Sequence, residues 1–260
     1  MLVRQGSGLP IVLLHGIGSR SFSFAPLIAA LDARRTVMAW DAPGYGGSAP
    51  LQNAAPLAGD YVAALFAALD AAGIARCDLV GHSLGTLVAA HAAASEPSRV
   101  RRLMLLSPTK GYGGVPGAPL PEAAGARVRE LEATGAEAFG RKRGSRLIYR
   151  ADRTPEAAAA AIAAMQTMTM PGYGQAAHML GTGDILTDVA RLRCPTLVAV
   201  GAEDVVTPSA IATDVAQAVP MAARVQAGPA IVPDCGHAFY LEKTANVAAL
   251  IDDHFGGAEA

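Results

Sequence analysis

The sequence is poor in cysteine, and the cysteines that it has show no recognisable spacing. Cys77, Cys194 and Cys235 lie far apart and form no C-x-x-C pair, so neither a disulfide framework nor a thiolate zinc site is indicated. The chain also lacks a basic and then apolar leader, and no apolar run approaches the roughly 20 residues that span a bilayer. A protein of the reducing cytoplasm, without a membrane partner, is the simplest expectation.

Charge of either sign is scarce, and the two signs are nearly balanced. Lys and Arg total 21 against 22 Asp and Glu, so that the formal net charge is −1. No general attraction to nucleic acid or to an anionic membrane is therefore expected, and a small neutral or singly charged substrate fits better. The densest basic stretch, residues 141–146, is interpreted as a solvated helix face. Its functional alternative is to bind a substrate carboxylate.

Apolar residues are abundant enough for a full core. They make up 52% of the 260 residues, against 17% that are charged. This balance is typical of a compact globular protein and excludes a disordered chain of low hydrophobicity and high charge. The length fits one domain, or one domain with an insertion.

Short β-branched or apolar runs alternate with longer helical patterns, which is the signature of parallel strands joined by crossover helices. The runs are apolar almost throughout, as expected for strands that helices cover on both faces. The pattern predicts an α/β fold with a doubly wound, mostly parallel sheet. Strands are expected at residues 11–14, 36–40, 77–80, 100–106 and 196–200, with a weaker one at 224–232, and helices at 24–31, 57–72, 84–95, 208–218 and 246–255.

The alternation stops between Ser107 and Asp188. An Ala-rich segment with few strand signals follows a glycine-rich stretch at residues 111–117. It is interpreted as a helical cap, inserted over the carboxyl edge of the sheet. A helix is expected over residues 155–168, because Pro155 suits a first helical turn and a run of alanines follows. The predicted division is an α/β core of residues 1–108 and 189–260 and a cap of residues 109–188.

The sharpest local signal is the stretch Gly81-His82-Ser83-Leu84-Gly85. It follows an apolar run and precedes a helical one, so it matches G-x-S-x-G in the strand, turn and helix context that this motif requires. A nucleophilic hydroxyl needs a sharp, strained turn, and flanking glycines let neighbouring backbone approach without a Cβ clash. Ser83 is therefore the predicted nucleophile. The alternative is an ordinary serine in a glycine-rich turn.

A second stretch, Leu13-Leu14-His15-Gly16-Ile17-Gly18, follows the first predicted strand. Acyl transfer requires backbone N–H groups that point at the oxygen that becomes negative in the tetrahedral intermediate. The predicted donors are Ile17 and Leu84, the residue directly after the nucleophile. His15 is expected to be structural, because the triad histidine is better supplied elsewhere.

The acid and the base of a triad are predicted late in the chain. Glu203 and Asp204 follow the strand at 196–200, and ligand sites gather at the carboxyl ends of strands in open α/β sheets. His237 follows in Asp234-Cys235-Gly236-His237. A neutral imidazole takes the serine proton only if its other nitrogen is held in the right tautomer, which is the task of the acid. Asp204 is favoured over Glu203 from its place in the motif.

Together these stretches resemble the α/β-hydrolase superfamily over nearly the whole chain. The resemblance rests on His15-Gly16, Asp41-Ala42-Pro43-Gly44-Tyr45-Gly46-Gly47-Ser48, Gly81-His82-Ser83-Leu84-Gly85, Gly201-Ala202-Glu203-Asp204 and Gly236-His237. Residues 170–180, followed by Asp184-Ile185, are similar to the end of the cap in 3-oxoadipate enol-lactonases. Related carbon–carbon bond hydrolases and cofactor-free haloperoxidases share most of these features.

The resemblance implies a serine hydrolase that cleaves a small carboxylic ester or lactone, such as an enol-lactone, through an acyl-enzyme on Ser83. It implies no metal and no organic cofactor. A carbon–carbon bond hydrolase of a ring-cleavage product, with the same triad, stays open as an alternative, and so does a non-catalytic ligand-binding protein of this fold. A serine at this turn argues against epoxide hydrolases and haloalkane dehalogenases, whose nucleophile there is aspartate. The expected partner is a small-molecule substrate, and the oligomeric state is not predicted.

Two departures from the family pattern limit the resemblance. Only residues 1–7 precede the strand before His15, so the first of the family's two opening strands is expected to be missing. The single tryptophan, Trp40, lies on a predicted strand. The cap therefore offers no indole to a substrate.

The cap contains the candidate substrate ligands. Arg143, Arg146 and His178 are possible partners for a substrate carboxylate, because a guanidinium binds such a group bidentately. An anionic lactone is the resulting hypothesis. His82 is expected to neighbour the site. Residues interpreted either as pocket lining or as plain packing are Tyr112, Tyr149, Tyr173, Met165 and Met168, and the histidines expected to be bystanders are His91 and His254.

Overall fold

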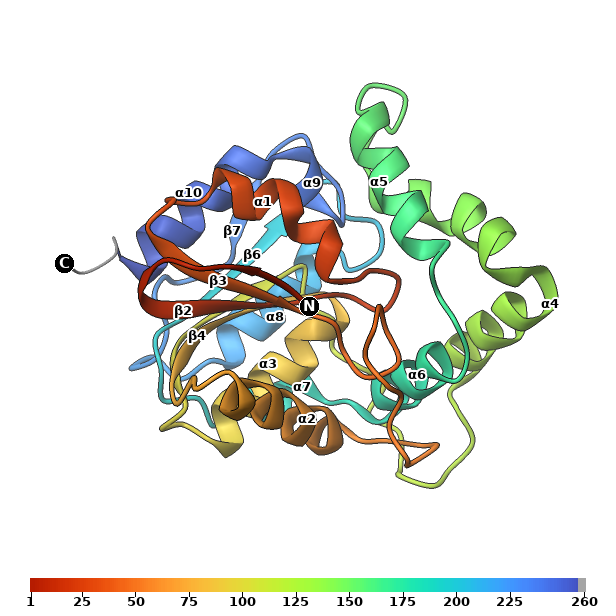
Figure 1. Ribbon diagram of the computed structural model, residues 1–260, viewed down its shortest axis with the longest axis horizontal. Helices are drawn as coiled ribbons and strands as arrows, with labels where there is room; N and C mark the ends of the chain where they lie inside the picture. The colour runs from red at the N-terminus through yellow and green to blue at the C-terminus, as the bar shows by residue number, and fades with distance from the viewer. Residues whose placement is uncertain (257–260) are drawn as a thin grey trace.

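The computed structural model describes residues 1–256 and has the layered architecture that the sequence predicts (Figure 1). In these residues a seven-stranded sheet has the order β1-β3-β2-β4-β5-β6-β7. All neighbouring strands pair in parallel except β1, which is antiparallel to β3. The strands are β1 (Leu2–Arg4), β2 (Ser7–Leu14), β3 (Arg35–Trp40), β4 (Cys77–His82), β5 (Val100–Leu106), β6 (Thr196–Gly201) and β7 (Ala230–Val232).

Helices cover both faces of the sheet, as Figure 1 shows. One face carries a 3₁₀ turn, η1 (Ser21–Phe24), with α1 (Ala25–Ala30), α9 (Phe239–Glu242) and α10 (Thr244–Phe255). The other face carries α2 (Ala58–Ala71), α3 (Leu84–Ser95), α7 (Ile185–Val189) and α8 (Ser209–Ala218). Crossover helices on alternate faces make the fold doubly wound.

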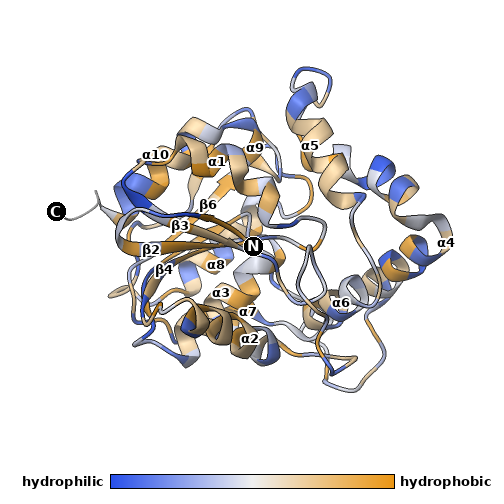
Figure 2. Ribbon diagram, in the orientation of Figure 1, coloured by the Kyte–Doolittle hydropathy of each residue, from blue (hydrophilic) through white to orange (hydrophobic). Residues whose placement is uncertain are grey.

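Alternate residues of the central strands pack against opposite helical layers. In β2, Val12 and Leu14 belong to the core under α2 and α3, whereas Ile11 and Leu13 belong to the core under α1 and α10. All four side chains are buried, and Figure 2 shows the strands as predominantly hydrophobic. Burial on both faces explains why the strands read as continuous apolar runs instead of alternating ones.

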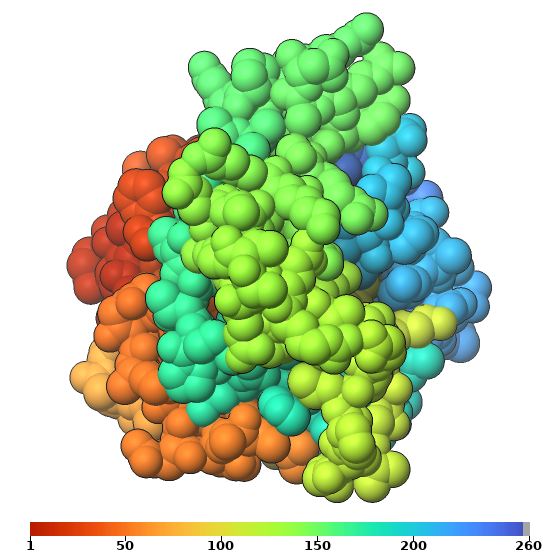
Figure 3. All heavy atoms as spheres, turned by 90° about the vertical axis from the view of Figure 1, so that its right-hand side faces the viewer, coloured from red at the N-terminus to blue at the C-terminus, as the bar shows by residue number. Residues whose placement is uncertain are grey.

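The segment between β5 and β6 forms the predicted helical cap. It contains α4 (Glu122–Gly144), the 3₁₀ turn η2 (Ser145–Leu147), α5 (Pro155–Met165) and α6 (Gly172–Thr182), and the chain then returns to the core through α7. Gly135 has a φ of 74° inside α4 and divides it into two helical parts. Figure 3, viewed from the cap side, shows these helices spread over the face of the molecule.

Several elements differ from the sequence prediction: β2 begins at Ser7 and not at Ile11, and α5 ends at Met165 and not at Met168. The strand expected over residues 224–232 is confined to β7, with an isolated bridge at Arg224, because Gly228 and Pro229 interrupt the run and proline donates no backbone hydrogen bond. The helix expected over 24–31 is divided into η1 and α1. In the described chain one short strand, β1, precedes β2. No helix within residues 1–256 is long and apolar enough to cross a membrane.

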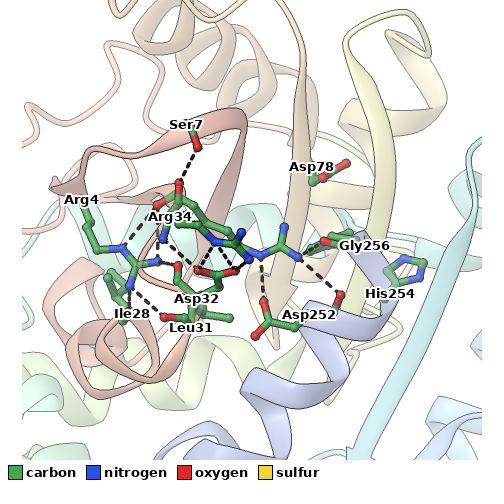
Figure 4. A network of polar contacts seen from close by, with 12 residues as sticks. Arg4, Ser7, Ile28, Leu31, Asp32, Arg34, Asp78, Asp252, His254 and Gly256 are labelled. Carbon is green, nitrogen blue, oxygen red and sulfur yellow. Dashed lines mark hydrogen bonds and ion pairs between the residues drawn. The ribbon is translucent and has the colours of Figure 1, made fainter. Parts of the chain in front are cut away.

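A polar network lies at the edge of the sheet where the parallel strands begin and the antiparallel β1 ends (Figure 4). Arg4 of β1 donates to backbone carbonyls of the loop before β3. Arg35 of β3 donates to Asp252 of α10 at 2.8 Å. Arg101 of β5 donates two hydrogen bonds, of 2.9 and 2.6 Å, to Asp78, which is fully buried. The network holds α10 against the sheet and leaves the carboxyl ends of the strands open toward the cap.

Candidate active site

Ser83 lies on a sharp turn between β4 and α3, as the motif predicts. Its φ is 52° and its ψ is −118°, a positive-φ conformation that is strained for a residue with a Cβ. A Cβ at Gly81 would lie 2.5 Å from the carbonyl oxygen of Gly85, and one at Gly85 would lie 2.3 Å from that of Leu14. Both motif glycines are therefore required, because the turn brings the backbones of β2, β4 and α3 into contact.

The predicted acid and base form a buried pair after β6 and β7. His237 Nδ1 lies 2.9 Å from Asp204 Oδ2, and Asp204 Oδ1 accepts the backbone N–H groups of Val206 and Thr207, both at 2.8 Å. Burial acts to raise the pKa of Asp204, but hydrogen bonds from His237 and from the Thr207 backbone outweigh it and lower the pKa to about 2. The acid is therefore ionised at neutral pH and favours the His237 tautomer that carries its proton on Nδ1.

Two hydroxyl groups that sequence reasoning missed support this pair. Thr207 Oγ1 donates to Asp204 Oδ2 at 2.9 Å and lies 3.2 Å from His237 Nδ1. Ser107 Oγ donates to the backbone oxygen of His237 at 3.1 Å. Aspartate side chains commonly accept hydrogen bonds from the backbone N–H groups two and three residues later in a turn. This local pattern could have indicated that Thr207 lies beside Asp204. Ser107 had no local signal, because its partner is 130 residues away in the chain.

Two further histidines support the loops around Ser83 and the His237–Asp204 pair. His15 Nε2 accepts the backbone N–H of Ala42 at 3.1 Å, and its Nδ1 lies 2.9 Å from the carbonyl oxygen of Gly16. His82 Nε2 lies 3.0 Å from the backbone oxygen of His237. Burial lowers the pKa of His15, and burial together with the charge of His237 lowers that of His82 to about 3. Both rings are thus neutral at pH 7, in keeping with structural roles.

The predicted oxyanion donors flank Ser83. A Cβ at Gly16 would lie 3.0 Å from the Ser83 Cβ and 3.5 Å from its Oγ, so the loop after β2 lies directly against Ser83. The carbonyl of Ile17 accepts a hydrogen bond of 2.8 Å from the Tyr45 hydroxyl, which holds this loop. Leu84 is the first residue of α3. The Leu84 position is compatible with the predicted role, because the first N–H groups of a helix lack intrahelical partners; Ile17 lies in the turn after β2, not in a helix.

Ser83 and His237 line one cavity, of about 170 Å³, between the core and the cap. Its lining from the loop after β2 includes Ile17, whereas Leu84 lines a separate, smaller cavity with Trp40 and Tyr61. The cap side of the Ser83 cavity is apolar apart from charged arginines. The apolar and aromatic cap residues of the lining are Phe139, Leu147, Ala161, Ala164, Met165 and Tyr173. Met165 and Tyr173 therefore line the cavity, whereas Tyr112, Tyr149 and Met168 are not part of its lining.

Three arginines supply the cap's charge at this cavity. Arg143 and Arg146, the candidate partners of a substrate carboxylate, line it, and Arg127 of α4, which the sequence did not single out, lines it with them. Arg143 Nε donates to Glu130 Oε2 at 2.6 Å, but Glu130 also pairs with Lys142 at 2.6 Å, so this carboxylate balances the charge of Arg143 only in part. Within residues 1–256, no carboxylate lies within ion-pair distance of Arg127, and no Asp or Glu lines the cavity.

The structure places His178 away from Ser83. His178 lies on α6 and lines two depressions, together with Leu120 and other residues, that are separate from the Ser83 cavity. The hypothesis that it contacts the substrate receives no support from this position. The bystander histidines lie in the core layers: His91 Nδ1 is 3.1 Å from Asp188, and His254 Nε2 is 2.9 Å from the Leu103 carbonyl oxygen. Among the described residues, no group of three His, Cys, Asp or Glu side chains could hold a metal ion.

Comparison with known proteins decides the family. The sequence profile described as "Alpha/beta hydrolase family" matches residues 11–250. This chain belongs to the α/β-hydrolase family. It is 31% identical over 242 residues to a protein of Klebsiella pneumoniae (strain 342) that bears the provisional name carbamate hydrolase RutD; the match covers 89% of this hydrolase and 85% of the relative. The predicted fold class and the resemblance to the superfamily are thereby confirmed.

Solved structures of the same fold include enzymes with different substrates. The enol-lactonase of Burkholderia xenovorans LB400 superposes with a TM-score of 0.84 at 23% identity, covering 98% of this hydrolase and 95% of that chain. The meta-cleavage product hydrolase of Pseudomonas fluorescens IP01 superposes with a TM-score of 0.76 at 22% identity, covering 96% and 91%. At these identities the likeness concerns the fold, and it does not select among substrates.

Proposed function

We propose that this hydrolase cleaves a small carboxylic ester or lactone through an acyl-enzyme on Ser83. The observation that carries the proposal is the hydrogen-bonded pair of His237 and Asp204, whose histidine lines the same cavity as the strained Ser83 turn. A serine hydroxyl is a weak nucleophile unless a neighbouring base takes its proton. A serine and a histidine whose other nitrogen contacts a carboxylate thus line one cavity, which supports the proposal.

In the proposed reaction, Ser83 Oγ attacks the substrate carbonyl carbon while His237 Nε2 takes the hydroxyl proton. Asp204, ionised at neutral pH, stabilises the imidazolium that forms. The N–H groups of Ile17 and Leu84 bind the oxygen that becomes negative. His237 then gives its proton to the departing alkoxide oxygen, which stays attached to the acyl group when the substrate is a lactone. A water molecule, deprotonated by His237, releases the acid and restores Ser83.

The charge of the cavity favours a substrate with a carboxylate or another anionic group. Arg127, Arg143 and Arg146 line it without an acidic lining residue, and charged groups in a restricted cavity attract ions of the opposite sign. Arg143 shares Glu130 with Lys142 and is neutralised only in part, whereas Arg127 and Arg146 have no ion-pair partner within residues 1–256 and offer their full charge. An anionic lactone or ester is therefore the proposed substrate class, with Arg127 added to the two arginines that the sequence indicated.

Carbamate hydrolysis is a second candidate, because the 31% identical relative bears that name over nearly the same length. The chemistry would use the same groups, since a carbamate also has a carbonyl carbon open to attack by Ser83. Carbon–carbon bond hydrolysis is represented among the solved structures only at identities that establish the fold. These alternatives differ from ester or lactone hydrolysis in the bond that is cleaved. A comparison of kcat/KM among the corresponding substrates distinguishes them.

The decisive experiment compares kcat/KM for 3-oxoadipate enol-lactone, a neutral aryl acetate, a small carbamate and a dienone ring-cleavage product under one set of conditions. We expect the anionic lactone to exceed the neutral ester, and Ser83→Ala to abolish both turnover and labelling by a fluorophosphonate. A hundredfold preference for the dienone, about 2.7 kcal/mol of transition-state discrimination, would overturn the proposed substrate class. A Ser83→Ala protein with a tenth of wild-type activity would overturn the nucleophile.

The arginine assignment has its own matched pair of variants. Arg127→Met should raise KM for the anionic substrate and leave kinetics with the neutral aryl acetate nearly unchanged. Arg129→Met is the control, because Arg129 lies on the same helix but is exposed and pairs with exposed Glu122 at 2.5 Å. If Arg127→Met changed KM equally for the charged and the neutral substrate, Arg127 would not contribute to recognition of the substrate's negative charge.

A further inference from the structure

The loop that carries His237 is attached to the cap as well as to the core. On the core side, Ser107 Oγ and His82 Nε2 contact the backbone oxygen of His237 at 3.1 and 3.0 Å. On the cap side, the backbone N–H of Ala238 donates to the carbonyl oxygen of Leu147 at 2.8 Å. The base of the proposed reaction therefore sits between two parts of the molecule that the sequence separates widely.

A single carboxylate spans the same junction. Glu242, at the end of α9, accepts the backbone N–H of Tyr149 at its Oε1, 2.9 Å away. Its Oε2 accepts the backbone N–H of Gly236 at 2.8 Å. Tyr149 belongs to the cap, and Gly236 directly precedes His237. Burial raises the pKa of Glu242 while these two hydrogen bonds oppose the rise.

The two segments that Glu242 joins both contribute to the cavity. Leu147 and Arg146 line it from the cap, two and three residues before Tyr149, and His237 and Ala238 line it from the other side. The segments also touch without spare room, because a Cβ at Gly236 would lie 2.8 Å from the Tyr149 nitrogen. A change in the Glu242 contacts would therefore move the cavity wall and the base relative to each other.

We propose that Glu242 is a positioning residue, which sets the cap segment 146–149 against the His237 loop and so fixes the base and the adjoining cavity wall in one geometry. The inference rests on the proposed function, since it concerns the same histidine. It assigns Glu242 no contact with substrate. Two acceptor oxygens are needed for the two donors, and only a carboxylate of this length supplies both.

The test exploits that requirement. Glu242→Gln keeps the size of the side chain but replaces one acceptor by an NH₂ donor, which leaves one of the two backbone N–H groups without its partner. Glu242→Ala removes both acceptors. Glu137→Gln is the matched control, because Glu137 is exposed and its charged partner is Arg141 on the same helix. Each variant is first titrated with a fluorophosphonate to count active sites, and its unfolding midpoint is measured.

We expect Glu242→Gln to lower the rate of fluorophosphonate labelling and kcat for a neutral ester about tenfold, counted per titrated site, the size of a lost buried hydrogen bond. Glu242→Ala should lower both further, and Glu137→Gln should match the wild type. Since Arg146 moves with the cap segment, KM for an anionic substrate should rise more than KM for the neutral ester. Hydrogen exchange should increase at residues 147–149 and 234–238 in both Glu242 variants.

Two results would overturn the proposal. One is a per-site labelling rate of Glu242→Gln within twofold of the wild type, since a structural glutamate would lower the number of active sites and not the rate of each. The other is unchanged hydrogen exchange at the two segments. If the wild-type protein is not labelled at all, the proposed function fails instead, and the exchange measurement alone decides whether Glu242 joins the cap to the histidine loop.

Discussion

Replacing Asp204 by asparagine tests the proposed role of the His237–Asp204 hydrogen bond with almost no change in side-chain shape. The asparagine oxygen can still accept the backbone N–H groups of Val206 and Thr207, which now bond to Oδ1 at 2.8 Å. The NH₂ group then takes the place of Oδ2, which lies 2.9 Å from His237 Nδ1. A donor facing Nδ1 selects the tautomer with its proton on Nε2, so the nitrogen directed at the substrate can no longer accept the Ser83 proton.

The expected loss is large, because the wrong tautomer removes the general base without emptying the site. A lost orienting carboxylate costs on the order of 10⁴ in kcat in the serine-protease precedent. We expect the kcat of Asp204→Asn for an aryl acetate to fall by a similar factor. We also expect a fluorophosphonate to label this variant slowly. Glu203→Gln is the control, since its side chain neighbours the acid in sequence and has no contact with His237. It should stay within a few-fold of the wild type.

The same variant makes a prediction about stability. The pKa of Asp204 is lowered from 3.8 to about 2, which corresponds to about 2 kcal/mol of native stability at neutral pH. A lowered carboxyl pKa contributes stability above the unfolded value, near 4, and loses it as the pH falls toward 2. Asp204→Asn should therefore be less stable at pH 7 and show a flatter decline between pH 4 and 2, as measured by urea unfolding.

Two outcomes would refute this reasoning. Asp204→Asn with more than a hundredth of wild-type kcat would mean that the acid does not orient His237. A greater loss in Glu203→Gln would transfer the role to Glu203. The activity and stability measurements are independent, so a stability change without an activity change would leave Asp204 as a structural acid.

Two further predictions concern the frame around the site. Gly85→Ala should cost about 1–3 kcal/mol or more in urea unfolding, because its Cβ would lie 2.3 Å from the Leu14 carbonyl oxygen and neither backbone can yield easily; an unchanged midpoint would contradict the packing of this turn. Arg101→Met should cost about 3–5 kcal/mol, because it leaves the fully buried Asp78 carboxylate without its bidentate partner. Arg129→Met removes one member of an exposed ion pair and should change the unfolding midpoint little. Equal midpoints for the two arginine variants would show that the buried Asp78 carboxylate does not need Arg101 for stability.

The core elements were predictable because their signals are local. The elbow around Ser83 combines glycines, a β-strand and a helix within about a dozen residues, and each part reinforces the others. Strands buried on both faces leave continuous apolar runs that need no knowledge of their neighbours. The helix at residues 84–95 and the strand at 100–106 were predicted to the residue for this reason. The run at 224–232 was overestimated, because its hydrogen bonds depend on Gly228 and Pro229 and not on apolar content.

The cap residues were harder to assign, because an amphipathic helix shows which residues share a face but not what that face meets. His178 and Tyr173 both lie on α6, yet Tyr173 lines the Ser83 cavity and His178 lines outer depressions. Arg127 had no motif to mark it and reaches the cavity through the packing of α4 over the core. Ser107 and Glu242 act on the His237 loop across 130 and 6 residues of chain, and the roles of both appear only when the backbone atoms are placed.

The sequence by itself determined the α/β architecture, the hydrolase family and the candidate triad of Ser83, Asp204 and His237. Strand burial and turn strain each produce a recognisable pattern within a short segment, and so does the order of the motifs along the chain. Only the tertiary structure decided which arginines line the cavity, that Lys142 and Arg143 share Glu130, and that Glu242 accepts hydrogen bonds from both the cap and the His237 loop. Those properties depend on distances between segments far apart in the chain, and such distances are set by packing, which no local pattern of residues encodes.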